Sequence, residues 1–136
     1  MNRTLIILSI ILFSNCVNLK KPNHDKYATL MTIKFVDIDI ETPIDIKCDN
    51  FENSFPDFQT KVVNDSMKIN QIINILKHLK IAGNEYYQHV DARIKLELKY
   101  NNDSIETICI DRFIVIRNNQ LLINTDSLKY FLTRTE

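Results

Sequence analysis

Apolar and charged residues alternate strictly over one stretch of the chain. Its apolar positions are Ala92, Ile94, Leu96, Leu98 and Tyr100, and its charged positions are Arg93, Lys95, Glu97 and Lys99. Successive side chains of a β-strand point to opposite faces, so a period of two predicts a strand with one buried face. We therefore expect a strand here whose charged side chains face solvent.

Two turn-forming segments follow this strand. Residues 101–104 are Asn, Asn, Asp and Ser, which tolerate turn geometry, and the pair Asn118-Asn119 separates an apolar run at 105–117 from another at 120–123. Asn also tolerates the positive φ that a two-residue hairpin turn requires. The pattern predicts an antiparallel meander of three strands over residues 91–124.

Shorter apolar runs earlier in the chain predict further strands. Residues 29–41 alternate, but the apolar phase changes near Phe35, which indicates a bulge there. Residues 44–48 alternate again after Pro43, and residues 58–63 could add one more strand. These runs extend the meander into a larger sheet.

Residues 66–80 give the clearest helical pattern. Apolar residues recur there at spacings of three and four, namely Ile69, Ile72, Ile73, Leu76 and Leu79. Asp65 or Ser66 is placed to cap the helix, and Gly83 to end it in the left-handed conformation. A short helix follows Asn124 or Thr125, with Leu128, Phe131 and Leu132 facing inward.

Together these patterns predict an α+β fold. It combines a mostly antiparallel sheet of about five to seven strands, including a C-terminal β-meander, with one long covering helix and a short C-terminal helix.

The composition narrows the classes of function. The 136 residues carry 17 basic and 17 acidic side chains, so no global field attracts nucleic acid. A single Gly excludes a glycine-rich phosphate loop, and the three His have no metal-ligand spacing. We expect no catalytic constellation, no metal and no cofactor, and Asp111-Arg112 indicates a bend in its strand.

Two polar clusters are candidates for recognition. Tyr86, Tyr87 and His89 form a polar-aromatic segment of a kind found at recognition surfaces, although Tyr beside a strand also packs as partly buried structure. Asp37, Asp39 and Glu41 indicate a solvated strand face, or three carboxylates for a hard cation.

Cys48 and Cys109 both lie in apolar runs that predict strands. In an oxidising compartment they could form a disulfide, provided that their strands are neighbours. The alternative is a pair of buried free thiols.

The N-terminus indicates where the protein is sent. Asn2-Arg3 precedes a nine-residue apolar core at 5–13, interrupted only by Ser9, whose helical length of roughly 14 Å is about half of a bilayer core. The segment Phe13-Ser14-Asn15-Cys16 resembles the lipobox of bacterial lipoproteins, which usually has Leu where Phe13 stands and Ala or Gly where Asn15 stands. The alternatives are ordinary signal-peptidase cleavage near Cys16 and an uncleaved anchor. The resemblance implies that Cys16 is lipidated with a fatty acid such as palmitate and becomes the mature N-terminus.

This resemblance predicts the organisation of the chain: a signal peptide at 1–15, a lipidated Cys with its tether at 16–28, and one domain at 29–136. In the lipoprotein family Asp after the Cys favours the inner membrane, so Val17 implies the outer membrane where the organism has one.

The leading hypothesis for function is a non-enzymatic binding module that is tethered to the membrane through Cys16 and binds another envelope component or protein. An exported enzyme inhibitor or immunity protein is the first alternative, and a hydrolase the second.

Overall fold

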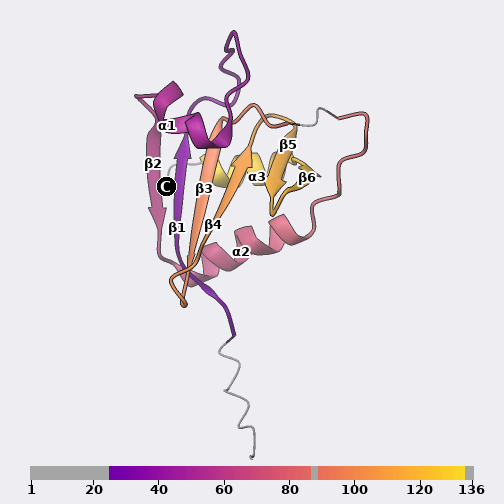
Figure 1. Cartoon of the computed structure of the whole chain (residues 1–136). Helices are drawn as coiled ribbons and strands as arrows, with labels where there is room; N and C mark the ends of the chain where they lie inside the picture. The colour runs from indigo at the N-terminus through magenta and orange to yellow at the C-terminus, as the bar shows by residue number, and fades with distance from the viewer. Residues whose placement is uncertain (1–24, 87–88, 134–136) are drawn as a thin grey trace, which may run out of the picture.

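The computed structural model describes residues 25–86 and 89–133, and these form one antiparallel sheet with helices on both of its faces (Figure 1). The strand order is β2-β1-β3-β4-β5-β6. The strands are β1 (Ala28–Phe35), β2 (Gln59–Val63), β3 (Ile94–Tyr100), β4 (Ile105–Ile110), β5 (Ile114–Arg117) and β6 (Gln120–Ile123). The predicted α+β class is confirmed.

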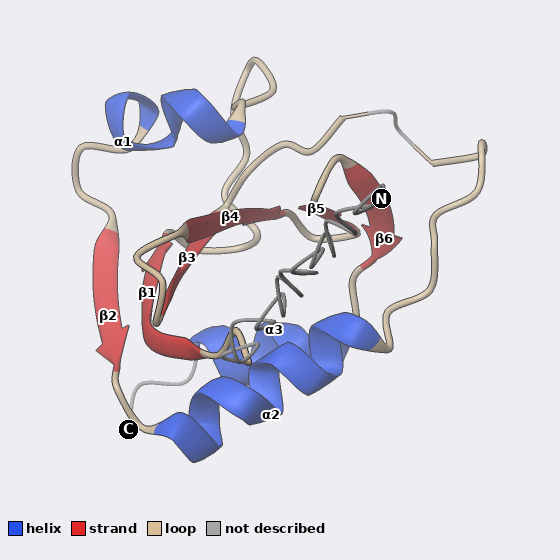
Figure 2. Cartoon of the chain, turned by 60° about the horizontal axis from the view of Figure 1, so that its bottom comes forward, coloured by secondary structure: helices blue, strands red, loops and turns tan. Residues whose placement is uncertain are grey.

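The helices are η1, a 3-10 turn at Cys48–Asn50, and α1 (Phe51–Ser54), α2 (Ser66–Lys77) and α3 (Asp126–Thr133). Figure 2 shows α2 and α3 on one side of the sheet and α1 on the other. No helix among the described residues is long and apolar enough to cross a bilayer.

The main core lies between the sheet and the two longer helices. The apolar phase of β3 meets Ile69, Ile72 and Leu76 of α2, together with Leu128 and Leu132 of α3. Burial of such side chains is the dominant favourable contribution to folding. The helix α2 spans 12 residues, fewer than the predicted range of 66–80, so the structure does not show the one long covering helix that the sequence predicted.

The helix α2 begins as predicted but ends early. The carboxylate of Asp65 accepts hydrogen bonds from the backbone N–H groups of Met67 and Lys68. The helix ends at Lys77, with His78 as its cap, so residues 78–80 lie outside it. Gly83 is not at its end and has no positive φ, so the predicted glycine cap is wrong.

The meander contains four strands, β3 to β6, because Asp111-Arg112 divides the predicted second strand into β4 and β5. The Asp111 carboxylate accepts hydrogen bonds from the N–H groups of Phe113 and Ile114, which holds the bend that the sequence indicated. At the β5–β6 turn Asn118 and Asn119 both adopt positive φ, as predicted.

A smaller core covers the upper part of the other face. It consists of Ile46, Phe51, Phe55, Val90, Ala92 and Cys109. The strand predicted at residues 44–48 is not formed. Residues 44–47 lie in a loop over the sheet, and the Ile46 side chain packs into the smaller core. Cys48 belongs to η1 and Cys109 to β4, and the structure joins them by a disulfide with their Cα atoms 5.8 Å apart.

The predicted strand at 29–41 ends at Phe35, where the change of phase had indicated a bulge. Beyond it the chain leaves the sheet, and Asp37 and Asp39 lie in a turn in which Asp37 accepts a hydrogen bond from the Asp39 N–H. These carboxylates do not line a strand face. The described residues contain no group of three or more side chains that could hold a metal ion.

Some of the charged side chains on the second face of β3 are buried. Lys99 is exposed, but Arg93 is only 4% exposed, and Lys95 is half-buried against α1. The prediction that all four charged positions face solvent is therefore wrong, because residues 37–58 fold over this face.

Candidate functional site

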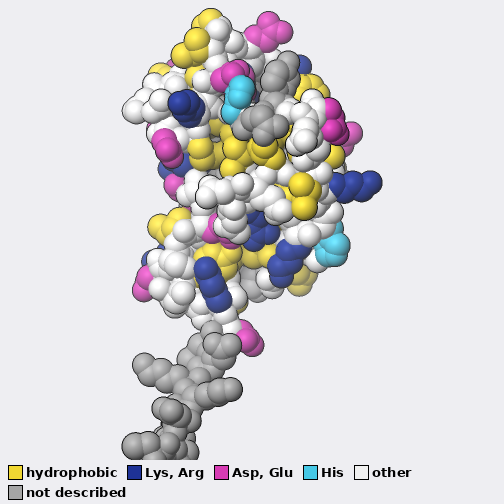
Figure 3. All heavy atoms as spheres, turned by 45° about the vertical axis from the view of Figure 1, so that its right-hand side comes forward, with side chains coloured by type: hydrophobic (Ala, Val, Ile, Leu, Met, Phe, Trp, Pro, Cys, Tyr) yellow, Lys and Arg dark blue, Asp and Glu magenta, His cyan; other side chains and the backbone are white. Residues whose placement is uncertain are grey.

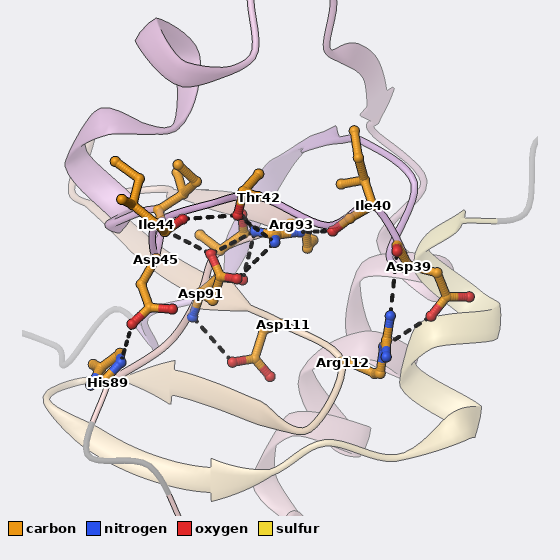
Figure 4. A network of polar contacts seen from close by, with 12 residues as sticks. Asp39, Ile40, Thr42, Ile44, Asp45, His89, Asp91, Arg93, Asp111 and Arg112 are labelled. Atoms are coloured by element: carbon orange, nitrogen blue, oxygen red, sulfur yellow. Dashed lines mark hydrogen bonds and ion pairs between the residues drawn. The ribbon is translucent and has the colours of Figure 1, made fainter.

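We name the upper cleft of the molecule the Arg93 cleft (Figure 4). It has a volume of about 440 Å³ and lies where the 37–45 loop meets the start of β3 and the bend between β4 and β5. Its lining residues are Ile38, Ile40, Glu41, Thr42, Asp45, His89, Asp91, Arg93, Asp111, Arg112 and Phe113.

Arg93 is fully engaged by the fold. It forms a two-pronged ion pair with Asp91, with Nη1–Oδ1 at 2.6 Å and Nη2–Oδ2 at 2.7 Å. Its Nε donates to the Ile40 carbonyl at 2.9 Å, and Nη2 also donates to the Thr42 hydroxyl at 2.9 Å. A planar guanidinium suits such multiple contacts. The buried cation therefore fastens the 37–45 loop to the sheet and is not available to a ligand.

The carboxylates of Asp91 and Asp111, which lie near Arg93, accept hydrogen bonds from backbone N–H groups. Asp91 accepts a hydrogen bond from the Ile46 N–H at 2.7 Å, and its own N–H donates to Asp111 at 3.2 Å. The floor of the Arg93 cleft is thus a structural network that joins three loops.

The rim of the Arg93 cleft carries two exposed ion pairs. His89 contacts Asp45, and both side chains are more than half exposed, while Arg112 pairs with Asp39 at 2.9 Å. His beside a carboxylate resembles part of a nucleophilic triad. The hydroxyl that lines this cleft, Thr42, donates to the Ile44 carbonyl at 2.8 Å and accepts from Arg93. It is therefore not oriented toward His89, and the cleft does not assemble a nucleophile with its base.

The structure does not bring the predicted recognition residues together in one cleft. His89 reaches the Arg93 cleft, whereas Tyr86 is half-buried and is not among its lining residues. Tyr87 and Cys16 lie outside the described residues.

A second cleft, which we name the β4–β5 cleft, has a volume of about 760 Å³. It is lined by Lys26, Tyr27, Ala28, Cys48, Asp49, Asn70, Ile73, Lys77, Tyr100, Ile105, Glu106, Thr107, Ile116, Arg117, Asn118 and Asn119. In Figure 3, Lys and Arg side chains surround hydrophobic surface on the lower half of the face shown.

An ionic network spans the β4–β5 cleft. Arg117 of β5 contacts Glu106 of β4 through two hydrogen bonds, at 2.8 and 3.2 Å, and the Tyr100 hydroxyl donates to the same carboxylate. Burial and the neighbouring Glu106 carboxylate raise the pKa of Tyr100 to about 12. Burial acts to raise the pKa of Glu106, but hydrogen bonds from Arg117 and Tyr100 outweigh it and lower that pKa. At neutral pH Glu106 and Arg117 are therefore both charged, and Tyr100 keeps its proton.

Sequence reasoning missed this network. Its signal was the phase of Glu106, which falls two and four residues before the buried Ile108 and Ile110 and so shares their face. A carboxylate on the buried face of a strand is costly unless it is paired with a cation or a hydrogen-bond donor. The sequence pattern does not show which residue is the partner, and the structure identifies it as Arg117.

A third polar cluster fixes α1 to the sheet. Lys34 and Lys95 both bind the Glu52 carboxylate, at 2.8 and 3.0 Å. Burial would raise the pKa of Glu52, but hydrogen bonds from Lys34 and Lys95 outweigh burial and lower it to about 2. Its folded-state pKa thus lies below the unfolded value of about 4.3.

The stabilisation by Glu52 is therefore present above pH 4.3 and is lost as the pH falls toward 2. We expect Glu52→Gln to be less stable than the wild type at pH 7, with the difference shrinking between about pH 4.3 and pH 2. Urea denaturation across this range measures the difference. Asp57→Asn, which removes an exposed carboxylate with no ion pair among the described residues, is the matched control. A difference for Glu52→Gln that does not change with pH would contradict the assignment.

Comparison with known proteins gives the chain no family: no protein-family model, curated protein or solved structure matches it.

Proposed function

We propose that this chain is a lipid-anchored protein of the cell envelope that acts by binding another envelope component. The export signal and the Cys16 anchor come from the lipobox resemblance of residues 1–16. A non-enzymatic role is supported by the Arg93 cleft, whose buried ionic groups are committed to backbone contacts and to each other.

The observation that carries the proposal is the juxtaposition of Cys48 and Cys109. These are the two cysteines of the predicted mature domain apart from Cys16, and their Cα atoms lie 5.8 Å apart. Disulfides persist in oxidising compartments and are rare in the reducing cytosol. A disulfide across the second face therefore fits a domain that works outside the cytoplasm.

The anchor is tested by metabolic labelling with an alkyne fatty acid. We expect the wild type to be labelled and Cys16→Ala to lose the label completely, because the acyl chain is attached at the Cys16 sulfur. Asn15→Ala is the matched control: it changes the neighbouring residue toward the usual lipobox and should retain the label. Equal labelling of the wild type and Cys16→Ala, or a mature N-terminus beyond residue 16, would overturn the proposal.

A further inference from the structure

Among residues 25–86 and 89–133, part of the β4 edge lacks a neighbouring strand. Tyr100 N–H donates to the Ser104 carbonyl, and Arg93 N–H donates to the Ile110 carbonyl. The β3–β4 register runs without interruption between these points, so the even-numbered residues of β4 direct their backbone groups toward β3. The backbone groups of Ile105, Thr107 and Cys109 consequently point away from β3.

Within the described part of the chain, Cys109 is the one outward position of the three that is paired. Among the described residues, β5 pairs with β4 at Cys109 and Ile110 and at no residue nearer the start of β4. The outward N–H and C=O groups of Ile105 and Thr107 therefore face the β4–β5 cleft, whose lining includes both residues. Unpaired backbone groups at a sheet edge are a template for another strand.

The strand β5 does not continue along this edge. It ends at Arg117, one residue beyond the partner of Cys109, and the chain then turns at Asn118 and Asn119. The free edge from Ile105 to Thr107 is roughly 10 Å long, enough for three or four residues of an extended chain.

The residues that line the cleft indicate which side chains of an added strand would bind favourably. Ile105 is 65% exposed and, with the half-buried Ile116, offers apolar surface on one face. Lys26 and Lys77 also line the cleft, and neither forms an ion pair among the described residues. The Lys26 ammonium lies 4.0 Å from the centroid of the Tyr100 ring, which leaves its charge unneutralised. Arg117 and Glu106 neutralise each other, so the two lysines outnumber the remaining carboxylate, Asp49.

We infer that the free edge of β4 binds an extended segment of a partner protein, in which apolar and acidic side chains alternate, as an added β-strand. Backbone hydrogen bonds to Ile105 and Thr107 supply the register, and Lys26 and Lys77 favour the acidic side chains. The inference rests on the proposed binding function and names its site.

Two other occupants fit less well. The chain's own residues 17–24 contain Lys20, Lys21 and Pro22, which would bring like charge and a missing backbone donor. A second copy paired antiparallel through Ile105 and Thr107 would place the two Glu106 residues opposite each other, and like charges in that position are unfavourable.

The test uses the full chain in detergent micelles and a capped hexapeptide of alternating Glu and Val as the probe. We expect the amide signals of Ile105 and Thr107 to shift on titration and their hydrogen exchange to slow at least about tenfold, as new backbone hydrogen bonds form. An alternating Lys and Val peptide should bind more weakly. The same Glu and Val peptide, N-methylated at every residue, should not bind, because it lacks all of its backbone donors.

Variants of the protein test both kinds of contact. Thr107→Pro removes the outward N–H without removing a hydrogen bond to β3, and should abolish binding. Lys77→Glu should weaken binding by about two- to fivefold, the range for an exposed ion pair. Lys68→Glu, which reverses an exposed lysine in the same helix but outside the cleft, should bind as the wild type does.

Four results would overturn the inference: no shift at millimolar peptide, shifts confined to the Arg93 cleft, equal binding of the N-methylated peptide, or concentration-dependent shifts at Ile105 and Thr107 without peptide. The last would assign the edge to a second copy. If Thr107→Pro does not fold, the N-methylated peptide alone decides whether backbone contacts drive binding. Loss of the Cys16 anchor leaves this titration unchanged, so it fails or succeeds separately from the proposed function.

Discussion

Replacing Asp91 by alanine is expected to lower the free energy of unfolding by about 3 kcal/mol, as the loss of one partner of a buried ion pair does. The Arg93 side chain is 5% exposed and would be left with an uncompensated charge. The loss should lie toward the lower end of the usual range because the Asp91 side chain is itself 31% exposed. The Ile46 N–H would also lose its acceptor. Urea denaturation at pH 7 measures the effect.

The Arg93 cleft supplies a matched control for this prediction. Asp39→Ala removes the other Asp–Arg pair of the cleft, in which Asp39 is 70% and Arg112 is 42% exposed. Exposed pairs contribute little, so this variant should stay within about 1 kcal/mol of the wild type. Equal losses for Asp91→Ala and Asp39→Ala would show that Arg93 is not held as described.

Removing the disulfide is expected to cost about 4 kcal/mol on the chain-entropy account. The bond joins residues 61 apart in sequence, so its loss gives the unfolded chain much more freedom. The test uses the double variant Cys48→Ala, Cys109→Ala. Alanine is chosen over serine because Cys109 is 1% exposed, and a serine hydroxyl would be buried there. Thermal and urea unfolding of this variant, compared with the wild type under non-reducing conditions, measures the loss.

Intact mass establishes whether the exported protein carries the bond. We expect no alkylation of Cys48 and Cys109 under denaturing conditions until a reductant is added, and two alkylations afterwards. Reductant should also bring the wild type to the stability of the double variant, and should leave the double variant unchanged. Two alkylated thiols without prior reduction would contradict the bond.

Local patterns predicted the elements that local physics determines. The alternation before Tyr100 gave β3, Asp65 gave the start of α2, and Asn118-Asn119 gave the last hairpin turn. In each case residues close together in sequence decide the geometry, through side-chain phase, a cap or a tolerated φ.

Features that depend on distant neighbours were not predictable in the same way. Residues 44–48 alternate as a strand does, but no strand pairs with them, and Ile46 packs as part of a cover over β3 and β4. Arg93 occupies a polar phase, which normally faces solvent, and is buried because that cover closes over it. The β4–β5 cleft lies between two strands that were predicted as a single strand over residues 105–117, so the sequence pattern did not indicate it.

The strand order also bears on the sequence of events in folding. The strands β3 to β6 are joined by short turns, whereas β1 must find β3 across more than fifty intervening residues. Closing a long loop costs entropy before any contact compensates for it, so local hairpins form sooner than distant pairings. We expect β3 to β6 to assemble first, while β1 and the 36–58 segment are still undocked. Cys109 would then already lie in a formed strand before Cys48 reaches it. The disulfide would therefore close in the last stage of folding.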